Sequence, residues 1–158
     1  MQKTSKKSKE FIELCEKYGA DPDNVPELTS FEDCCKRMGY DPEKLLPDVS
    51  VFPARHQKAL TGTAKLFIIH EAFNYDDKKK EVYEPDWDDS DEYKWRYWFD
   101  MEKDANIPSG FRFYDSLYDF TSTYSTGGSR LCNRNEDISI FIGKHFTELF
   151  RDVMVFQK

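Results

Sequence analysis

The chain has 158 residues, of which 39% are hydrophobic and 34% charged, and its formal net charge is -7. This acidic balance argues against a protein that coats duplex DNA, because affinity for the phosphate backbone is largely electrostatic. No apolar run approaches the roughly 18 residues that a membrane span needs, and the basic N-terminus lacks the hydrophobic segment of a signal peptide. We therefore expect one soluble, cytoplasmic domain, 1–158, with a helical segment (1–52) followed by a helix, a sheet and a C-terminal helix (53–158).

Two short amphipathic helices are predicted near the N-terminus. Apolar residues follow the i, i+3, i+4, i+7 spacing over 11–18 and again over 31–38, and the two runs end at Gly19 and Gly39. The segments FIELCEKYGADP and FEDCCKRMGYDP align at an offset of 20 residues. Either the segment is duplicated, or two unrelated helices share the same Gly-x-Asp-Pro stop, which is a common helix C-terminal signal.

A longer helix is predicted to begin near Pro53, since proline is favoured in the first turn of a helix. The chain is predicted to close with one helix from about Asn135, which carries a wide apolar stripe. On that helix Gly143 is expected to allow the close approach of a strand or of another helix.

Alternating residues predict strands between these helices, at 93–102 and 110–120. A Gly-Gly turn signal at 127–128 then leads to a predicted short strand at 129–132. The predicted fold is α+β. It has a three-stranded antiparallel meander, the C-terminal helix on the apolar face of that sheet, and the N-terminal helices packed at one end.

The sequence predicts neither a metal site nor a cofactor. There is no C-x-x-C pair, and the histidines lack ligand spacing. The segment that starts at His70 lacks the second histidine of H-E-x-x-H, because position 74 is Asn. Reduced thiols are expected at all four cysteines, because a chain of this size does not depend on disulfides. These are Cys15, Cys34, Cys35 and Cys132.

The segment EPDWDDSDE (84–92) contains six acidic residues among nine. A calcium loop is excluded, since Asp91 and Tyr97 stand where the loop needs Gly and Glu. An acidic run is most often a solvated loop. Trp87 has two possible roles here: it covers the core with its large apolar ring, or it is an exposed anchor for a basic partner, since Trp is enriched at interface hot spots.

Basic and aromatic residues alternate on the predicted solvated face of the sheet. Such a face is typical of single-strand nucleic-acid binding, through base stacking and phosphate contacts. Cross-strand Arg and aromatic pairs also stabilise any small sheet, and no RNP motif is present. The candidate residues are Lys94, Arg96, Trp98, Arg112, Tyr114 and Tyr118, with Arg130 and Arg134 nearby.

Catalytic motifs are missing from the sequence. It has no G-x-S-x-G, P-loop or dinucleotide fingerprint, so an enzyme is not the favoured prediction. Ser129 and Arg130 follow the Gly-Gly pair, and their backbone N–H groups and guanidinium suit an anion. A tight turn into an edge strand explains the same residues. Cys132 needs a lowered pKa to act as a nucleophile, and the sequence places no histidine beside it.

The segments GGSRLCNRNEDISIFIGKHFTELFRD, EPDWDDSDEYKW and HQKAL…IIHEAFN resemble a group of small proteins encoded by phages and mobile elements of gut Bacteroidota. That group shares a Trp-Pro-Asp-Trp-like segment, an aromatic strand, and a Gly-Ser-Arg-Leu-Cys strand leading into a Gly-Lys-x-Phe helix. The resemblance covers about residues 53–153, where Glu84 replaces the first Trp and Asn133 follows the cysteine. It implies a phage or prophage origin and no particular activity.

The leading prediction is therefore a non-enzymatic phage accessory or virion-associated protein in the host cytoplasm. It is expected to act by binding a protein, either from the host or the phage or a second copy of itself, and not a membrane. One alternative is single-strand nucleic-acid binding through the Arg and aromatic face. A second alternative is a small anionic ligand site or enzyme site at the 127–132 turn.

Overall fold

The computed structural model describes residues 7–102, 110–119 and 128–156, and its fold is α+β. Its helices are α1 (Lys9–Tyr18), α2 (Phe31–Met38), α3 (Pro42–Leu45), α4 (Ala54–Asn74), α5 (Glu136–His145) and α6 (Thr147–Met154), with the 3₁₀ turns η1 (Pro22–Asn24) and η2 (Ser129–Leu131). Its strands are β1 (Tyr75–Asp76), β2 (Glu81–Val82), β3 (Lys94–Asp100) and β4 (Arg112–Asp119).

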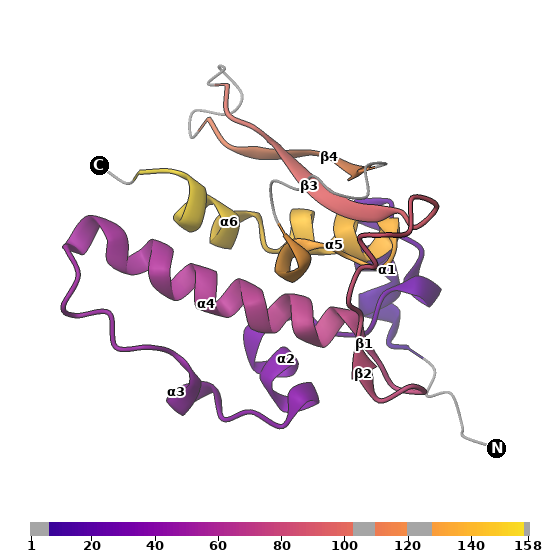
Figure 1. The fold of residues 1–158 in the computed structure, drawn as a ribbon, viewed down its shortest axis with the longest axis horizontal. Helices are drawn as coiled ribbons and strands as arrows, with labels where there is room; N and C mark the ends of the chain where they lie inside the picture. The colour runs from indigo at the N-terminus through magenta and orange to yellow at the C-terminus, as the bar shows by residue number, and fades with distance from the viewer. Residues whose placement is uncertain (1–6, 103–109, 120–127, 157–158) are drawn as a thin grey trace.

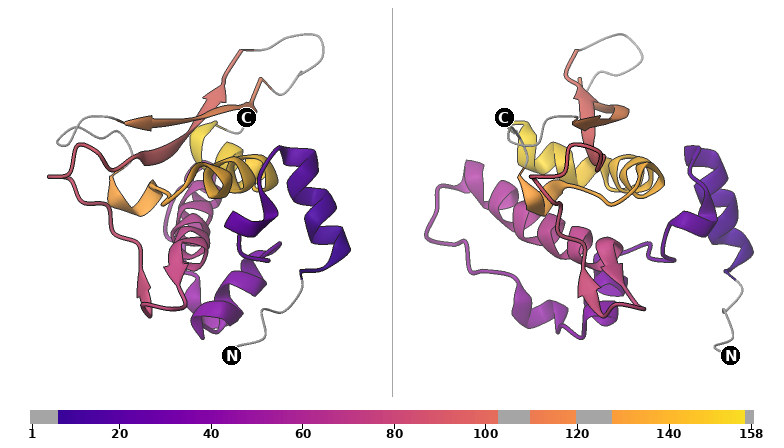
Figure 2. Two further views of the ribbon diagram at one scale, coloured as in Figure 1. Left: turned by 90° about the vertical axis from the view of Figure 1, so that its right-hand side faces the viewer. Right: turned by 45° about the vertical axis from the view of Figure 1, so that its right-hand side comes forward.

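The elements are stacked in layers (Figure 1). The β3–β4 pair lies on one side of α5 and α6, and α4 lies on their other side with α2 beyond it. Helix α1 packs beside α5. Figure 2 shows that the chain after α4 runs past the edge of the helical layers to reach β3. Helices α5 and α6 are therefore covered by the strands on one side and by α4 on the other.

The predicted N-terminal helices are confirmed, and the two aligned segments have the same local structure. Gly19 and Gly39 each follow the helix in the left-handed region, with φ of 77° and 76°. Asp21 and Asp41 then each accept a hydrogen bond from the amide two residues later and begin a short proline-containing turn. The sequence similarity therefore reflects one repeated helix–turn conformation.

The predicted long helix is confirmed as α4, whereas the single C-terminal helix is wrong. The chain leaves the helical conformation at Phe146, between α5 and α6. Within a continuous helix the Thr147 amide would donate to the Gly143 carbonyl. Instead the Thr147 hydroxyl donates to that carbonyl at 2.7 Å, so a side chain takes the place of a helical backbone bond.

The three-stranded meander is also wrong, because the described strands form two antiparallel pairs, β1–β2 and β3–β4. The predicted third strand, 129–132, contains the η2 turn, and the Cys132 amide bonds back to the Ser129 carbonyl at 3.4 Å. One isolated bridge, between Trp95 and Asn133, keeps this segment beside β3. The β1–β2 hairpin lies outside the three predicted strands. Residue 127 of the turn signal lies outside the described residues.

A β-bulge at Tyr114 changes which side chains of β4 share a face. Trp98 pairs with Asp115, and the next residue, Phe99, pairs with Phe113, so Tyr114 is the extra residue. Beyond Tyr114, each side chain of β4 therefore lies on the face opposite to the one that strict alternation along the strand would give. Strict alternation along 110–120 would place Leu117 on the same face as Phe113, but Leu117 is 43% exposed on the opposite face.

The core is formed mainly between α1, α2, α4 and α5. Phe141 of α5 lies near its centre, with ring centroids 5.5 Å from Phe11, 5.7 Å from Tyr18 and 5.7 Å from Phe73. Aromatic pairs at these separations add to the stabilisation from apolar burial. The described residues contain no helix that is long and apolar enough to span a membrane.

Candidate functional site

The predicted basic face of the sheet is wrong at two of its positions. Lys94 and Arg96 are only 1% and 7% exposed. The acidic segment 84–92 folds over them, and the Trp87 ring centroid lies 5.9 Å from Lys94 Nζ and 5.8 Å from Arg96 Cζ. Lys94 Nζ also donates to the Asp89 carbonyl at 2.6 Å. Burying these cations is feasible because carbonyl and carboxylate oxygens and an aromatic ring surround them.

Trp87 is half-buried and joins the acidic segment to η2. Its indole Nε1 donates to Ser129 Oγ at 2.9 Å. The side chain therefore folds back, as one of its two predicted roles required, but it covers β3 and η2 rather than the central core. Its ring is held between two buried cations and a hydroxyl.

What remains of the outer sheet face is mainly apolar. Trp98, Tyr114 and Leu117 are 57%, 69% and 43% exposed. Arg112 pairs with Asp100 at 2.6 Å. Arg134 is half-buried at the end of α4, where its amide donates to Asn74, so it does not join this face. The face is not the basic groove with aromatic platforms that single-strand binding generally uses.

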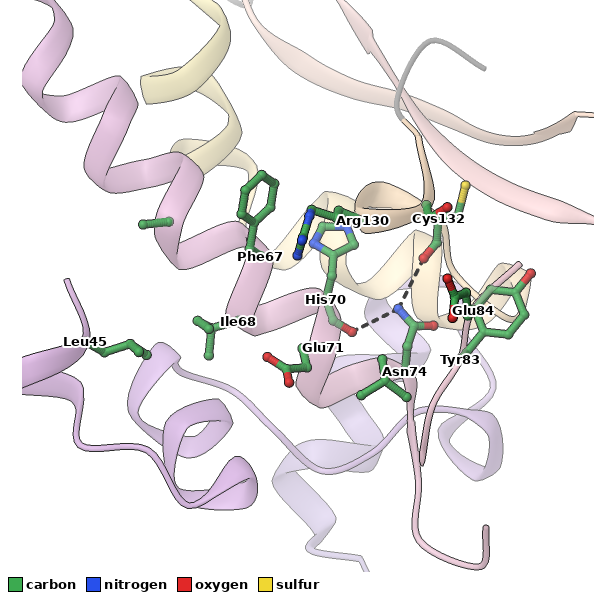
Figure 3. A pocket seen from close by; sticks show the side chains of 13 residues that line it. Leu45, Phe67, Ile68, His70, Glu71, Asn74, Tyr83, Glu84, Arg130 and Cys132 are labelled. Carbon is green, nitrogen blue, oxygen red and sulfur yellow. Dashed lines mark hydrogen bonds between the residues drawn. The ribbon is translucent and has the colours of Figure 1, made fainter. Parts of the chain in front are cut away.

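A pocket of about 620 Å³ lies against the outer side of α4 (Figure 3). Its other walls come from the segment 82–84, from η2 and from α3. This volume is in the range of pockets that hold small molecules, about 300–1,000 Å³. The apolar part of the lining is Leu45, Ala64, Phe67, Ile68 and Val82.

Arg130 brings a cation to the apolar wall of this pocket. Its guanidinium carbon lies 5.5 Å from the centre of the Phe67 ring, and the two side chains lie side by side in Figure 3. Within the described part of the chain Arg130 has no ion pair or hydrogen bond. Its N–H donors are thus available to an anion, while the ring contact favours one placement of the side chain.

Two carboxylates also line the pocket. The hydroxyl of Tyr40 donates to Glu71 Oε1 at 2.9 Å, which orients the Glu71 carboxylate. Glu84 lies on the facing wall and is exposed. Neither carboxylate forms a salt bridge with a described residue. Since Arg130 is the one cationic side chain among the lining residues, the lining carries more negative than positive charge.

A buried hydrogen-bond network supports the inner end of the pocket. His70 is 2% exposed, and its Nδ1 donates to the Leu66 carbonyl at 2.7 Å. Its Nε2 must then accept from the Tyr97 hydroxyl at 2.7 Å. Burial lowers the pKa of His70 to about 4 and raises the pKa of Tyr97 well above its ordinary value. Both groups are therefore neutral near pH 7.

Asn74 and Asn133 extend this network to the chain beyond η2. Asn133 Nδ2 donates to the Tyr97 hydroxyl oxygen at 2.6 Å. Asn74 Nδ2 lies 3.1 Å from Asn133 Oδ1 and 3.3 Å from the Cys132 carbonyl, and Asn74 Oδ1 accepts from the Arg134 amide at 2.9 Å. Figure 3 shows the Asn74 bond to the Cys132 carbonyl at the pocket wall.

These network residues were not predicted from the sequence, although one signal was available. His70 and Asn74 are one helical turn apart on a face of α4 that otherwise buries Leu66 and Phe73. Two polar residues at i, i+4 on a buried helix face require partners from another element. His70 and Asn74, which occupy the two histidine positions of the H-E-x-x-H pattern, therefore have a structural role as a buried polar pair.

Cys132 lines the same pocket as His70, which the sequence did not anticipate. Both ring nitrogens of His70 are already engaged, by Leu66 and Tyr97, so this histidine is not placed to activate the thiol. Cys132 Sγ donates to the Gly128 carbonyl at 3.3 Å. All four cysteines are buried thiols that form no disulfide, and burial raises the pKa of Cys15 to about 11 and that of Cys34 to about 12.

No group of three or more His, Cys, Asp or Glu side chains able to hold a metal ion occurs among the described residues. Comparison of the chain with protein-family models, curated proteins and solved structures gives no match. The function is therefore inferred from the chemistry of the pocket and of the exposed surface.

Proposed function

We propose that the pocket along α4 binds a small molecule with an apolar body and one anionic group. The observation that carries this proposal is the Arg130 guanidinium, whose carbon lies 5.5 Å from the centre of the Phe67 ring at the wall of a cavity of about 620 Å³, without an ion pair in the described chain. A pocket with apolar walls and a few convergent polar groups is the usual form of a ligand site. The anion pairs with Arg130, and the apolar body lies against Ala64 and Ile68.

The test measures binding of 3-phenylpropionate and L-phenylalanine by calorimetry or by NMR titration. Arg130→Gln is expected to weaken binding of both carboxylates about tenfold or more, because a hydrogen bond to a charged group contributes about 1.5–3 kcal/mol. Arg55→Gln is the control, since Arg55 is an exposed arginine of α4 outside the pocket lining. Equal binding by wild type and Arg130→Gln contradicts the proposal, as does failure of both compounds to bind.

The exposed side of β3–β4 favours a second candidate function, self-association. Trp98, Tyr114 and Leu117 project large apolar side chains from a pair of strands whose other face packs on α5. Aromatic anchors are typical of interface hot spots, and hot spots tend to pair with one another. A symmetric dimer places the same patch on both subunits. This candidate retains the predicted non-enzymatic, protein-binding role of a phage accessory protein.

Light scattering over a range of protein concentrations tests this second candidate. The wild type is expected to form dimers, and Trp98→Ala is expected to raise the dimer dissociation constant about tenfold or more, as for a hot-spot residue. Val51→Ala is the control, because Val51 is 83% exposed and lies before α4, away from the strands. A monomer at every concentration, or equal effects of the two substitutions, contradicts self-association through this face.

A further inference from the structure

We infer that the ligand of the pocket is a zwitterion, an amino carboxylate with an apolar side chain, whose carboxylate pairs with Arg130 and whose ammonium pairs with Glu71. This inference rests on the proposed function, because it specifies the ligand of the same site. The Glu71 contact is opposite in sign to the Arg130 contact, so the two together favour an amino acid over an apolar acid that lacks an ammonium group.

The first observation is the state of the Glu71 carboxylate. One oxygen accepts the Tyr40 hydroxyl at 2.9 Å, and within the described chain the other oxygen has no hydrogen-bond partner. The carboxylate is half-buried in the pocket lining. An ammonium group supplies the N–H donors and the positive charge that this oxygen lacks.

The second observation is that the two charged side chains line the same part of the pocket. The Arg130 guanidinium carbon lies 5.5 Å from the centre of the Phe67 ring, and Glu71 follows Phe67 by four residues on α4. Residues four apart lie on one face of a helix. Both partners therefore stand beside one turn of α4, and an amino carboxylate, whose ammonium and carboxylate are attached to the same carbon, presents opposite charges to them.

The third observation is the charge of the lining as a whole. Glu71 and Glu84 stand against the single cation Arg130, and the buried His70 is neutral because burial lowers its pKa to about 4. A dianion such as a phosphate monoester would meet two like charges for one opposite charge. A ligand that brings its own positive charge avoids this repulsion, since like charges in a partly buried site are weakly screened.

Three compounds that share one apolar body test the inference at pH 7. L-Phenylalanine carries both charges, 3-phenylpropionate lacks the ammonium, and 2-phenylethylamine lacks the carboxylate. L-Phenylalanine is expected to bind about tenfold more tightly than either analogue, since a tenfold change in Kd corresponds to about one charge-assisted hydrogen bond.

The variant Glu71→Gln keeps an oxygen for the Tyr40 hydroxyl but loses the charge. It is expected to weaken L-phenylalanine and 2-phenylethylamine about tenfold while leaving 3-phenylpropionate unchanged or tighter. Glu13→Gln is the matched control, because Glu13 is on α1, outside the pocket lining, and forms an exposed ion pair with Lys9. Thermal unfolding of each variant confirms that the fold is retained.

The outcomes separate the inference from the proposed function. If 3-phenylpropionate binds as tightly as L-phenylalanine and depends on Arg130, the zwitterion inference is overturned and the anion site stands. Equal weakening of all three compounds by Glu71→Gln also overturns the inference, since it indicates a structural role for Glu71. If none of the three binds, both proposals fail.

Discussion

Asn74→Ala is expected to lower the free energy of unfolding by about 4 kcal/mol. Asn74 is 2% exposed and bonds to Asn133 Oδ1, to the Cys132 carbonyl and to the Arg134 amide. Removing its amide leaves several of these buried groups without a partner, and each such group costs about 1–3 kcal/mol. Chemical denaturation monitored by circular dichroism measures the loss.

Asn24→Ala provides the matched control, because the same side-chain amide is deleted at an exposed site. Asn24 Nδ2 donates to Asp137 at 2.8 Å and is solvent-accessible. Its loss is expected to cost less than about 1 kcal/mol, since water replaces the lost partner. Similar destabilisation by the two variants contradicts the role assigned to the buried network.

Gly143→Ala is expected to destabilise the protein by about 3 kcal/mol, although alanine is the better helix former. A Cβ at Gly143 overlaps the Phe113 ring and lies 3.0 Å from Tyr97 Cδ1. Both rings belong to the β3–β4 pair, so the strands must shift away from α5. Overpacking of this kind typically costs about 1–3 kcal/mol. The close approach that the sequence analysis expected at this glycine is thus confirmed.

Gly62→Ala tests the same substitution where the neighbour is able to move. There the nearest atom to the added Cβ is Val153 Cγ2 at 2.9 Å, on a half-buried side chain of α6. The gain of up to about 1 kcal/mol in helix propensity offsets the displacement of this side chain. Thermal unfolding of both variants is the measurement. Destabilisation of Gly62→Ala equal to that of Gly143→Ala contradicts the steric explanation.

The helices were predictable because their determinants are local. The apolar spacing ahead of Gly19 and Gly39 identifies α1 and α2, and the left-handed conformation at each glycine ends them. The bulge at Tyr114 was not predictable, since an extra residue in one strand depends on the pairing with β3. The burial of Lys94 likewise depends on how the preceding acidic segment folds back over β3, which the alternation of residues does not show.

The site was predictable only in part. Ser129 and Arg130 were named as one candidate anion site, beside the alternative of a tight turn into an edge strand, because glycine, backbone amides and a guanidinium are adjacent in the sequence. Phe67 and Glu71 were not connected to them, because tertiary packing of α4 against η2 brings these residues together. Periodicity identifies α4 as a helix but does not show which partner covers each face.

The pocket takes its walls from segments spread along most of the chain. Leu45, Phe67, Glu84 and Arg130 come from α3, α4, the segment after β2 and η2. Hydrogen bonds of Asn133 with Asn74 and with Tyr97 hold the segment after η2 beside α4 and β3. If the proposed ligand binds, its binding and the folding of the segments that line the pocket are linked equilibria. A ligand that binds only the complete pocket stabilises the native state but does not stabilise partly folded states.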